Sequence, residues 1–309
     1  MSRRLAQTLT APGLMLVGGT SMYLGAAIAV GLFDRLEPAA VAWLRIAGAA
    51  VALVVWVRPP VAAWRRDRLV LAGVFGLITA AMNIAFYEAL DRLPLGTTVA
   101  LEFLGPVAVA AFGSRTRRDI AALLLAVVGV ALIVDVQWSA TPAGLAFALI
   151  AAACWAGYIV LGKRVALRGS GIEDLATGFV VAAVLTSPLA WGLTDAFDPD
   201  APTLRLLGLG VLLGILSTAL PYALDQVILR SVGRAQFAIL LALLPVTAAV
   251  VGVIVLRQIP PAVEIVGIAA VAAAIVVQAV RPSGAVNDAD GAETDGAVTG
   301  DGRATPPPS

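Results

Sequence analysis

Two charged side chains, Glu102 and Arg45, lie inside segments that are otherwise apolar. Glu102 falls in LEFLGP at 101–106, and Arg45 falls in WLRIAGAAVALVVW at 43–56. A charge inside a membrane span costs about 2.5 to 3.5 kcal/mol on insertion scales, so such residues commonly mark substrate or ion paths. Glu102 could bind a substrate amine, or carry a proton, because a buried carboxyl can exist in its neutral form. Arg45 could bind a substrate carboxylate, pair with Glu102, or reach toward the membrane interface.

Polar side chains form two stripes with helical spacing. Asn83 and Tyr87 are four residues apart, and Tyr222 stands three and four residues before Asp225 and Gln226. Residues with this spacing share one face of a helix. Each stripe could line a substrate path, or it could join neighbouring helices by hydrogen bonds, as membrane Asn, Gln and Tyr often do.

Two prolines and one aromatic pair complete the candidate site. Pro106 and Pro245 each interrupt an apolar run, which predicts either a helix break beside a cavity or a packing kink. Trp155 and Tyr158 are three residues apart, so they could line the same cavity or pack between helices.

The residues that most enzymes and metal sites need are scarce. The chain has no histidine and one cysteine, Cys154, which excludes His-based catalysis, His-ligated metals and disulfides. It also lacks a Gly-x-Ser-x-Gly motif. We therefore expect no enzyme activity, no cofactor and no metal, and the net charge of +1 gives no basic surface for nucleic acid.

The composition predicts an all-α integral membrane protein. Hydrophobic residues make up 60% of the 309, and the mean hydropathy is +0.94. A span needs about 20 mostly apolar residues. Ten segments qualify: 12–33, 38–57, 69–89, 97–113, 119–135, 142–162, 174–193, 204–229, 235–256 and 263–280. The polar, Gly- and Pro-rich residues 282–309 are expected to form a disordered tail.

The spans fall into two halves with a recurring pattern. Pro106 returns as Pro245, and the turns after Leu90 and Leu229 also correspond, which indicates five-helix repeats at 12–135 and 142–281. Five spans per half is an odd number, so the two repeats must be inverted relative to each other. Inverted repeats with interrupted helices are typical of secondary transporters, whose substrate site lies near the membrane midplane.

Arginine and lysine set the expected orientation. One side of the membrane collects fifteen of them and the other side collects four, namely Arg35, Arg92, Arg205 and Arg257. The positive-inside rule then places residues 1–11 and the C-terminus in the cytoplasm.

The segments NIAFYEALDRLPLGTTVALEFLGP, at 83–106, and LPYALDQVILR with FAILLALLPVTAAVVG resemble the drug/metabolite transporter superfamily. The chain is most similar to EamA-type transporters, within them to the threonine and homoserine exporter group. The resemblance implies a ten-helix basket in the bacterial inner membrane, with Tyr87, Glu102, Tyr222 and Asp225 at the cavity. The chain departs from the group at Leu244 and at Arg257-Gln258, where acids are usual.

Together these features predict a proton-coupled exporter of small metabolites, especially hydrophilic amino acids. Arg45 and Glu102 would bind the carboxylate and the amine, and Glu102 would also carry the coupling proton. The expected substrate-pathway residues are Arg45, Asn83, Tyr87, Glu102, Tyr158, Tyr222, Asp225 and Gln226. Two alternatives stay open: efflux of drugs, aromatic compounds or nucleobases through the same fold, and a non-transporting scaffold or sensor.

Overall fold

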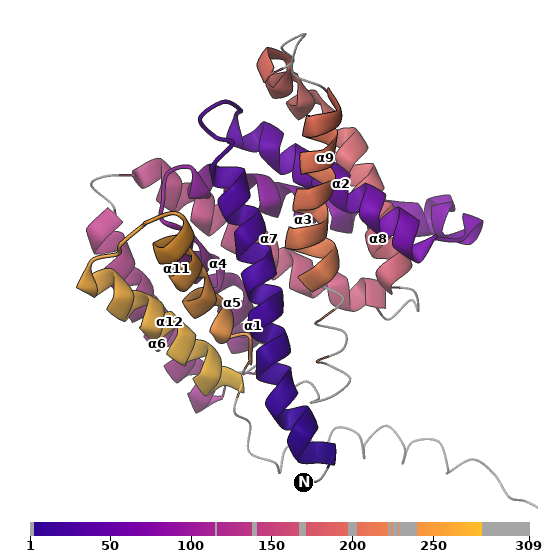
Figure 1. The fold of residues 1–309 in the computed structure, drawn as a ribbon. Coiled ribbons are helices and arrows are strands. Elements are labelled where there is room, and N and C mark those ends of the chain that lie inside the picture. The colour runs from indigo at the N-terminus through magenta and orange to yellow at the C-terminus, as the bar shows by residue number, and fades with distance from the viewer. Residues whose placement is uncertain are drawn as a thin grey trace, which may run out of the picture. The chain divides into compact units, whose positions relative to one another are not determined.

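The structure is a computed structural model that describes residues 3–114, 116–137, 141–166, 171–196, 203–221, 224, 228 and 240–279 (Figure 1). Within these residues every regular element is helical, which confirms the predicted all-α class. The elements are α1 (Arg3–Val30), α2 (Pro38–Val57), η1 (Val61–Trp64), α3 (Arg66–Leu90), α4 (Leu95–Glu102), α5 (Leu104–Ser114), α6 (Arg117–Gln137), α7 (Pro142–Ala166), α8 (Gly171–Leu185), η2 (Ser187–Ala196), α9 (Thr203–Gly214), η3 (Ile215–Ala219), α11 (Leu243–Val255) and α12 (Ala262–Ala279). The predicted tail, 282–309, lies outside the described residues.

Four of these helices are long and apolar enough to cross a membrane: Ala11–Val30, Pro38–Val57, Arg66–Leu90 and Pro142–Leu161. A fifth span is possible if Ile172–Leu185 and Ser187–Leu193, which meet at 59°, are counted together. Shorter apolar helices overlap other expected segments without being long enough to count as spans: Leu95–Val109, Ile120–Ile133, Gly208–Ala219, Leu243–Val255 and Ala262–Val277.

The helix that carries Glu102 is interrupted directly after that residue. α4 ends at Glu102 and α5 begins at Leu104, so the break lies at Phe103, slightly before Pro106. Proline is tolerated in a first turn because the N–H that it lacks has no intrahelical partner there. Pro245 has the same place in the first turn of α11. In both cases the proline belongs to the start of a helix rather than to its interior.

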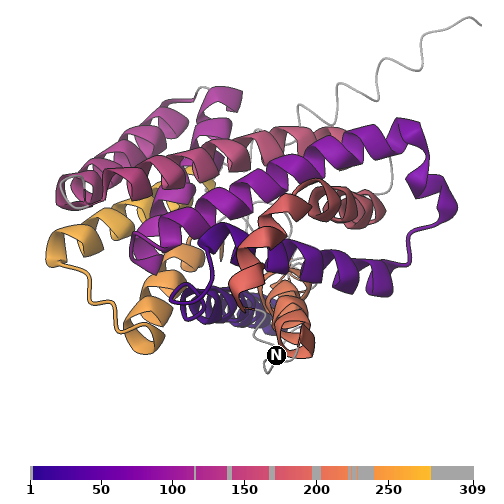
Figure 2. The same cartoon turned by 90° about the horizontal axis from the view of Figure 1, so that it is seen from above.

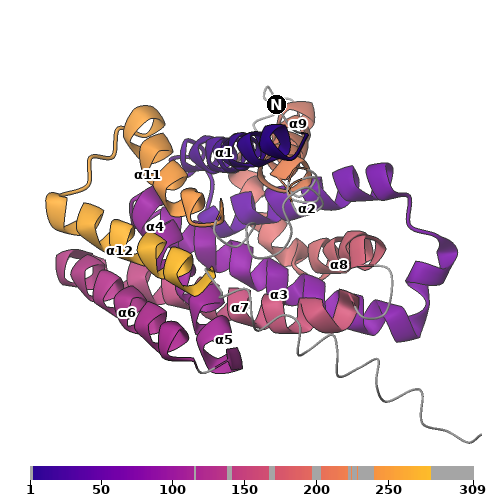
Figure 3. The same cartoon turned by 90° about the horizontal axis from the view of Figure 1, so that it is seen from below.

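The helices pack mainly with partners from the other half of the sequence. α3 lies beside α7 and α8, α2 beside α9 and α8, and α1 beside α11 and η3 (Figure 2). α4 contacts both α7 and α11, while α6 and α12 run side by side (Figure 3). Residues from distant parts of the sequence therefore meet between these helices.

Glycines allow several of these helix pairs to approach until their backbones touch, and two of the pairs illustrate it. A Cβ added to Gly76 of α3 would overlap the backbone of Gly178 in α8, and one added to Gly48 of α2 would overlap the backbone of Gly210 in α9. Small residues permit such close packing of membrane helices, where van der Waals contact drives association.

We expect Gly76→Ala to destabilise the protein by about 1 to 3 kcal/mol, because the methyl group forces α3 and α8 apart. Gly208→Ala is the matched control, since an added Cβ meets nothing within 4 Å there. The difference is measured as the unfolding temperature of each detergent-purified variant, with size-exclusion chromatography after heating as the readout of folded protein. Equal unfolding temperatures for the two variants would contradict the packing argument.

Candidate functional site

A cavity of about 330 Å³ lies between helices of both halves of the sequence. Its lining comes from α1, α2, α3, α4, α5, α7, η3 and α11, together with Phe103 and residues near the ends of these elements. The polar residues that line it are Tyr23, Arg45, Asn83, Glu102, Tyr158 and Ser217. A concave, mostly apolar site with a few converging polar groups is the usual form of a small-molecule site.

Arg45 is held in place from two directions. Its Nη2 donates a hydrogen bond to the carbonyl oxygen of Ser217, at 3.1 Å, and its guanidinium lies 5.5 Å from the ring centroid of Tyr87. Ser217 belongs to η3, a π-helical turn in which the i→i+5 pattern alters the ordinary hydrogen-bond ladder. A guanidinium has five N–H donors, so this single bond leaves others for a ligand.

Tyr87 is the support on which Arg45 lies. The side chain is completely buried and does not line the cavity. Its ring meets Phe33 edge to face, with centroids 5.9 Å apart. Tyr87 therefore contacts Arg45, which lines the cavity, without lining the cavity itself.

Glu102 reaches the cavity from the last residue of α4. Its carboxyl is within the electrostatic influence of Arg45, but in the described part of the chain the two side chains form no ion pair within 4.0 Å. The cavity thus contains a cation and a carboxyl group that do not contact each other. Such an arrangement can bind a zwitterion between the two groups.

Asn83 places an amide at the same cavity. Its Nδ2 donates to the carbonyl oxygen of Thr79 at 2.7 Å, and the hydroxyl of Thr79 donates to the carbonyl oxygen of Phe75 at 2.8 Å. These bonds within α3 fix the orientation of the amide. Its carbonyl oxygen can accept a hydrogen bond from a ligand.

The aromatic pair of α7 both lines the cavity and packs against other helices, the two possibilities that the sequence left open. Trp155 and Tyr158 line the cavity, and each also packs on another ring. Trp155 meets Phe103 edge to face, and Tyr158 stacks on Phe75, in both cases with centroids 4.7 Å apart. The aromatic wall is therefore fixed in position by its own packing.

The structure brings together six of the predicted residues on one cavity: Arg45, Asn83, Glu102, Pro106, Trp155 and Tyr158. The predicted Tyr222, Asp225 and Gln226 lie outside the described residues. Pro245 is not in the lining, although its neighbour Leu244 is.

Sequence reasoning missed several contributors from α1 and η3. Tyr23, Met15 and Met22 line the cavity from α1, and Ser217 lines it from η3. Tyr23 could have been found as a polar residue inside the first apolar run. The methionines carry no comparable signal, because in sequence they look like lipid-facing residues.

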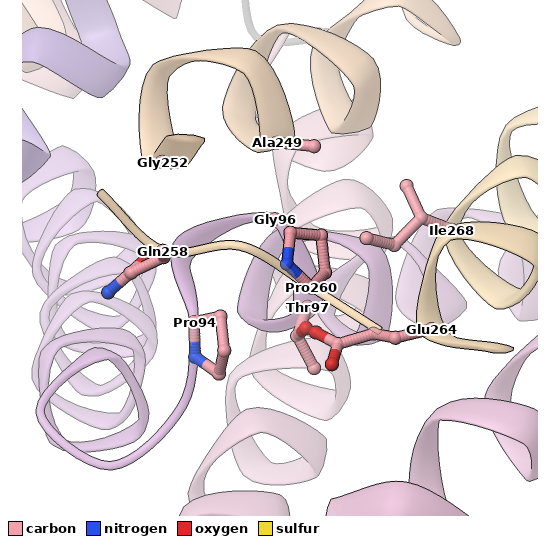
Figure 4. A pocket seen from close by; sticks show the side chains of 9 residues that line it. All are labelled: Pro94, Gly96, Thr97, Ala249, Gly252, Gln258, Pro260, Glu264 and Ile268. Atoms are coloured by element: carbon pink, nitrogen blue, oxygen red, sulfur yellow. The ribbon is translucent and has the colours of Figure 1, made fainter. Parts of the chain in front are cut away.

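A much smaller pocket, of about 10 Å³, lies where α4, α11 and α12 meet (Figure 4). Figure 4 shows the side chains of Thr97 and Glu264 pointing toward each other, and both residues are completely buried. Gln258 Oε1 accepts a hydrogen bond from the Leu95 N–H at 2.9 Å, in the first turn of α4. This space holds about one water molecule, so it is too small for a substrate. The residues around it hold the helices together.

Metal ligands do not converge in the described residues: no group of three or more His, Cys, Asp or Glu side chains could hold an ion there. The chemistry of the cavity is that of hydrogen bonds, charge and apolar contact.

Comparisons with known proteins identify the family. The EamA-like transporter family matches residues 142–279. The threonine/homoserine exporter RhtA of Salmonella typhimurium (strain SL1344) is 33% identical over 264 residues, which cover 84% of this chain and 88% of that protein. RhtA of Escherichia coli (strain K12) is 32% identical over the same length. The chain belongs to the EamA-like transporter family. The predicted resemblance is thereby confirmed, and the protein is a membrane transporter, not an enzyme.

A solved crystal structure supports the fold of this EamA-like transporter. It covers 89% of this chain and 96% of its own, with a TM-score of 0.55 and 19% sequence identity. At that identity the likeness concerns the fold alone.

Proposed function

We propose that this protein exports small zwitterionic metabolites, in particular hydrophilic amino acids of the threonine and homoserine kind. One observation carries the proposal: Arg45 and Glu102 face one cavity without pairing with each other. A guanidinium matches a carboxylate, and a carboxyl group matches an ammonium group. The RhtA relatives are threonine/homoserine exporters, which supports the same substrate class.

The proposed architecture has ten spans in two inverted repeats, 12–135 and 142–281. Helix contacts support it, because exchanging helices for their counterparts in the other repeat converts several of the observed contacts into other observed contacts. The contact of α3 with α8 becomes that of α9 with α2, and the contact of α4 with α7 becomes that of α11 with α1. Self-corresponding pairs, such as α6 with α12, are the ones expected at a pseudo-two-fold axis.

In this proposal the protein lies in the bacterial inner membrane with both termini in the cytoplasm. The support is the excess of arginine and lysine in alternate loops. The cavity would open to each side in turn as the repeats exchange their arrangement.

Protons are the proposed coupling ion. Glu102 is the carboxyl group that lines the cavity in the described residues, and it adjoins the helix break at Phe103. A proton and a substrate ammonium could bind this group alternately, because each satisfies the same carboxylate. Import of a proton would then accompany export of a metabolite.

A second candidate function is efflux of larger aromatic or drug-like compounds, and the apolar part of the cavity favours it. Met15, Met22 and Met82, which are all the methionines after Met1, line this part beside Trp155. Methionine adapts to irregular partners and is common at promiscuous binding surfaces.

Reconstituted vesicles can test the two functions side by side. We expect labelled threonine and homoserine to leave the side of the membrane that corresponds to the cytoplasm faster when a pH gradient is imposed. Vesicles without the protein should show no such effect. An aromatic dye is the comparison substrate. Gradient-driven movement of the dye alone would overturn the amino-acid proposal in favour of the second candidate.

A further inference from the structure

A groove runs along the outer surface of α3 and α8, apart from the cavity described above. It has a volume of about 420 Å³, and the residues that define it here are Trp64, Arg66, Val70, Val74, Val181 and Leu185. α3 and α8, labelled in Figure 1, touch at Gly76 and Gly178, and residues of both helices line the groove. We call it the α3/α8 groove.

Apolar side chains cover the length of the α3/α8 groove. Val70 is 61% exposed and Leu185 is 59% exposed, although α3 is among the helices long enough to span a membrane. Exposed aliphatic residues on a spanning helix contact lipid chains rather than water. The groove is therefore shaped and lined to receive an acyl chain.

One end of the groove is cationic. Arg66 is an exposed residue at the first position of α3 and lines this end. Its neighbours are neutralised by carboxylates: Arg65 lies 3.9 Å from Asp67, and Arg68 lies 2.7 Å from Asp174. Arg66 forms no ion pair within 4.0 Å among the described residues, so its charge is available to a ligand.

Trp64 marks the same end as a membrane–water interface. It closes the short helix η1, and 39% of its surface is exposed beside Arg66. Tryptophan concentrates at the level of lipid headgroups because its ring is apolar while its N–H is polar. A lipid chain in the groove would thus place its phosphate beside the Arg66 guanidinium.

We infer that the α3/α8 groove binds one anionic phospholipid, with an acyl chain along Val70, Val74 and Leu185 and with the phosphate on Arg66. Arginine-rich surfaces close to membrane spans favour anionic headgroups, and each basic residue contributes about a fivefold gain in affinity. Phosphatidylglycerol suits this site better than phosphatidylcholine, because the choline group would place the cation of the lipid itself close to Arg66.

Native mass spectrometry of the full-length, detergent-purified protein tests the inference with added phosphatidylglycerol or phosphatidylcholine. We expect wild-type protein to prefer phosphatidylglycerol, and Arg66→Gln to weaken that binding about fivefold. Arg117→Gln is the matched control, since Arg117 is also an exposed arginine at the first position of a helix, α6, but lies outside the groove. Equal affinity of wild type for the two lipids, or equal losses in the two arginine variants, would overturn the inference.

A second variant tests the acyl-chain half of the site. Val74 is 46% exposed in the groove, so Val74→Phe fills it without disturbing the protein core. We expect this variant to retain fewer molecules of either lipid after delipidation, while Val127→Phe on α6, 52% exposed and outside the groove, retains the wild-type number. Unchanged lipid retention in Val74→Phe would show that no chain occupies the groove.

Discussion

Glu102→Gln is expected to abolish stimulation of export by a pH gradient and to lower the rate in a gradient at least about tenfold. Glutamine keeps the shape of the side chain but cannot exchange a proton. It also leaves a substrate ammonium group without its anionic partner in the cavity. Both effects fall on the proposed coupling step, because Glu102 lines the cavity and adjoins the helix break.

The measurement is efflux of labelled threonine from vesicles with and without the gradient. Glu88→Gln is the control, because Glu88 is bonded to Arg92 at 2.7 Å, near the end of α3, and does not line the cavity. We expect this control to behave like wild type. Persistent gradient stimulation in folded Glu102→Gln protein would remove Glu102 from the coupling step, and loss in both variants would point to a general effect on the protein.

Arg45→Gln is expected to weaken binding of amino-acid substrates about 10- to 100-fold, which corresponds to the loss of one charge-assisted hydrogen bond. Arg45→Lys should recover only part of the affinity. Lysine restores the charge, but it lacks the planar fork that can bond Ser217 and a carboxylate together and stack on Tyr87.

Competition experiments with threonine and threoninamide separate this role from a structural one. Threoninamide lacks the carboxylate, so its binding should differ little between wild type and Arg45→Gln. The apparent affinity for each compound, measured as inhibition of labelled threonine export, gives the comparison. Equal losses for both compounds would mean that Arg45 shapes the cavity without binding the carboxylate.

Charges were the most reliable sequence signal for the candidate site. Arg45 and Glu102 stand out because a charge in an apolar run needs a polar environment, and both line the cavity. Helical spacing was less decisive. It placed Asn83 and Tyr87 on one face of α3, yet only Asn83 reaches the cavity, because Tyr87 is covered by Arg45 of α2. Contacts between helices decide this, and the sequence of a single helix does not contain them.

Other features depend on backbone geometry that has no clear mark in the sequence. The Ser217 carbonyl receives Arg45 within a π-helical turn, whereas the sequence there predicts a continuous span. Gln258, noted only as a departure from the family pattern, accepts a hydrogen bond from the first turn of α4. The prolines predicted helix breaks close to the observed positions. Pro106 lies in the first turn of α5, so the break itself comes earlier, at Phe103.

The glycine contacts between neighbouring helices limit how this transporter can move. Where Gly76 meets Gly178, and where Gly48 meets Gly210, backbone lies against backbone, so no side chain can rotate to let the helices slide apart. α2 also packs on α8 and α3, which joins both pairs into one stiff frame. We therefore expect the rearrangement that opens the cavity to occur in helices outside this frame, with the junction of α4 and α5 at Phe103 as a hinge.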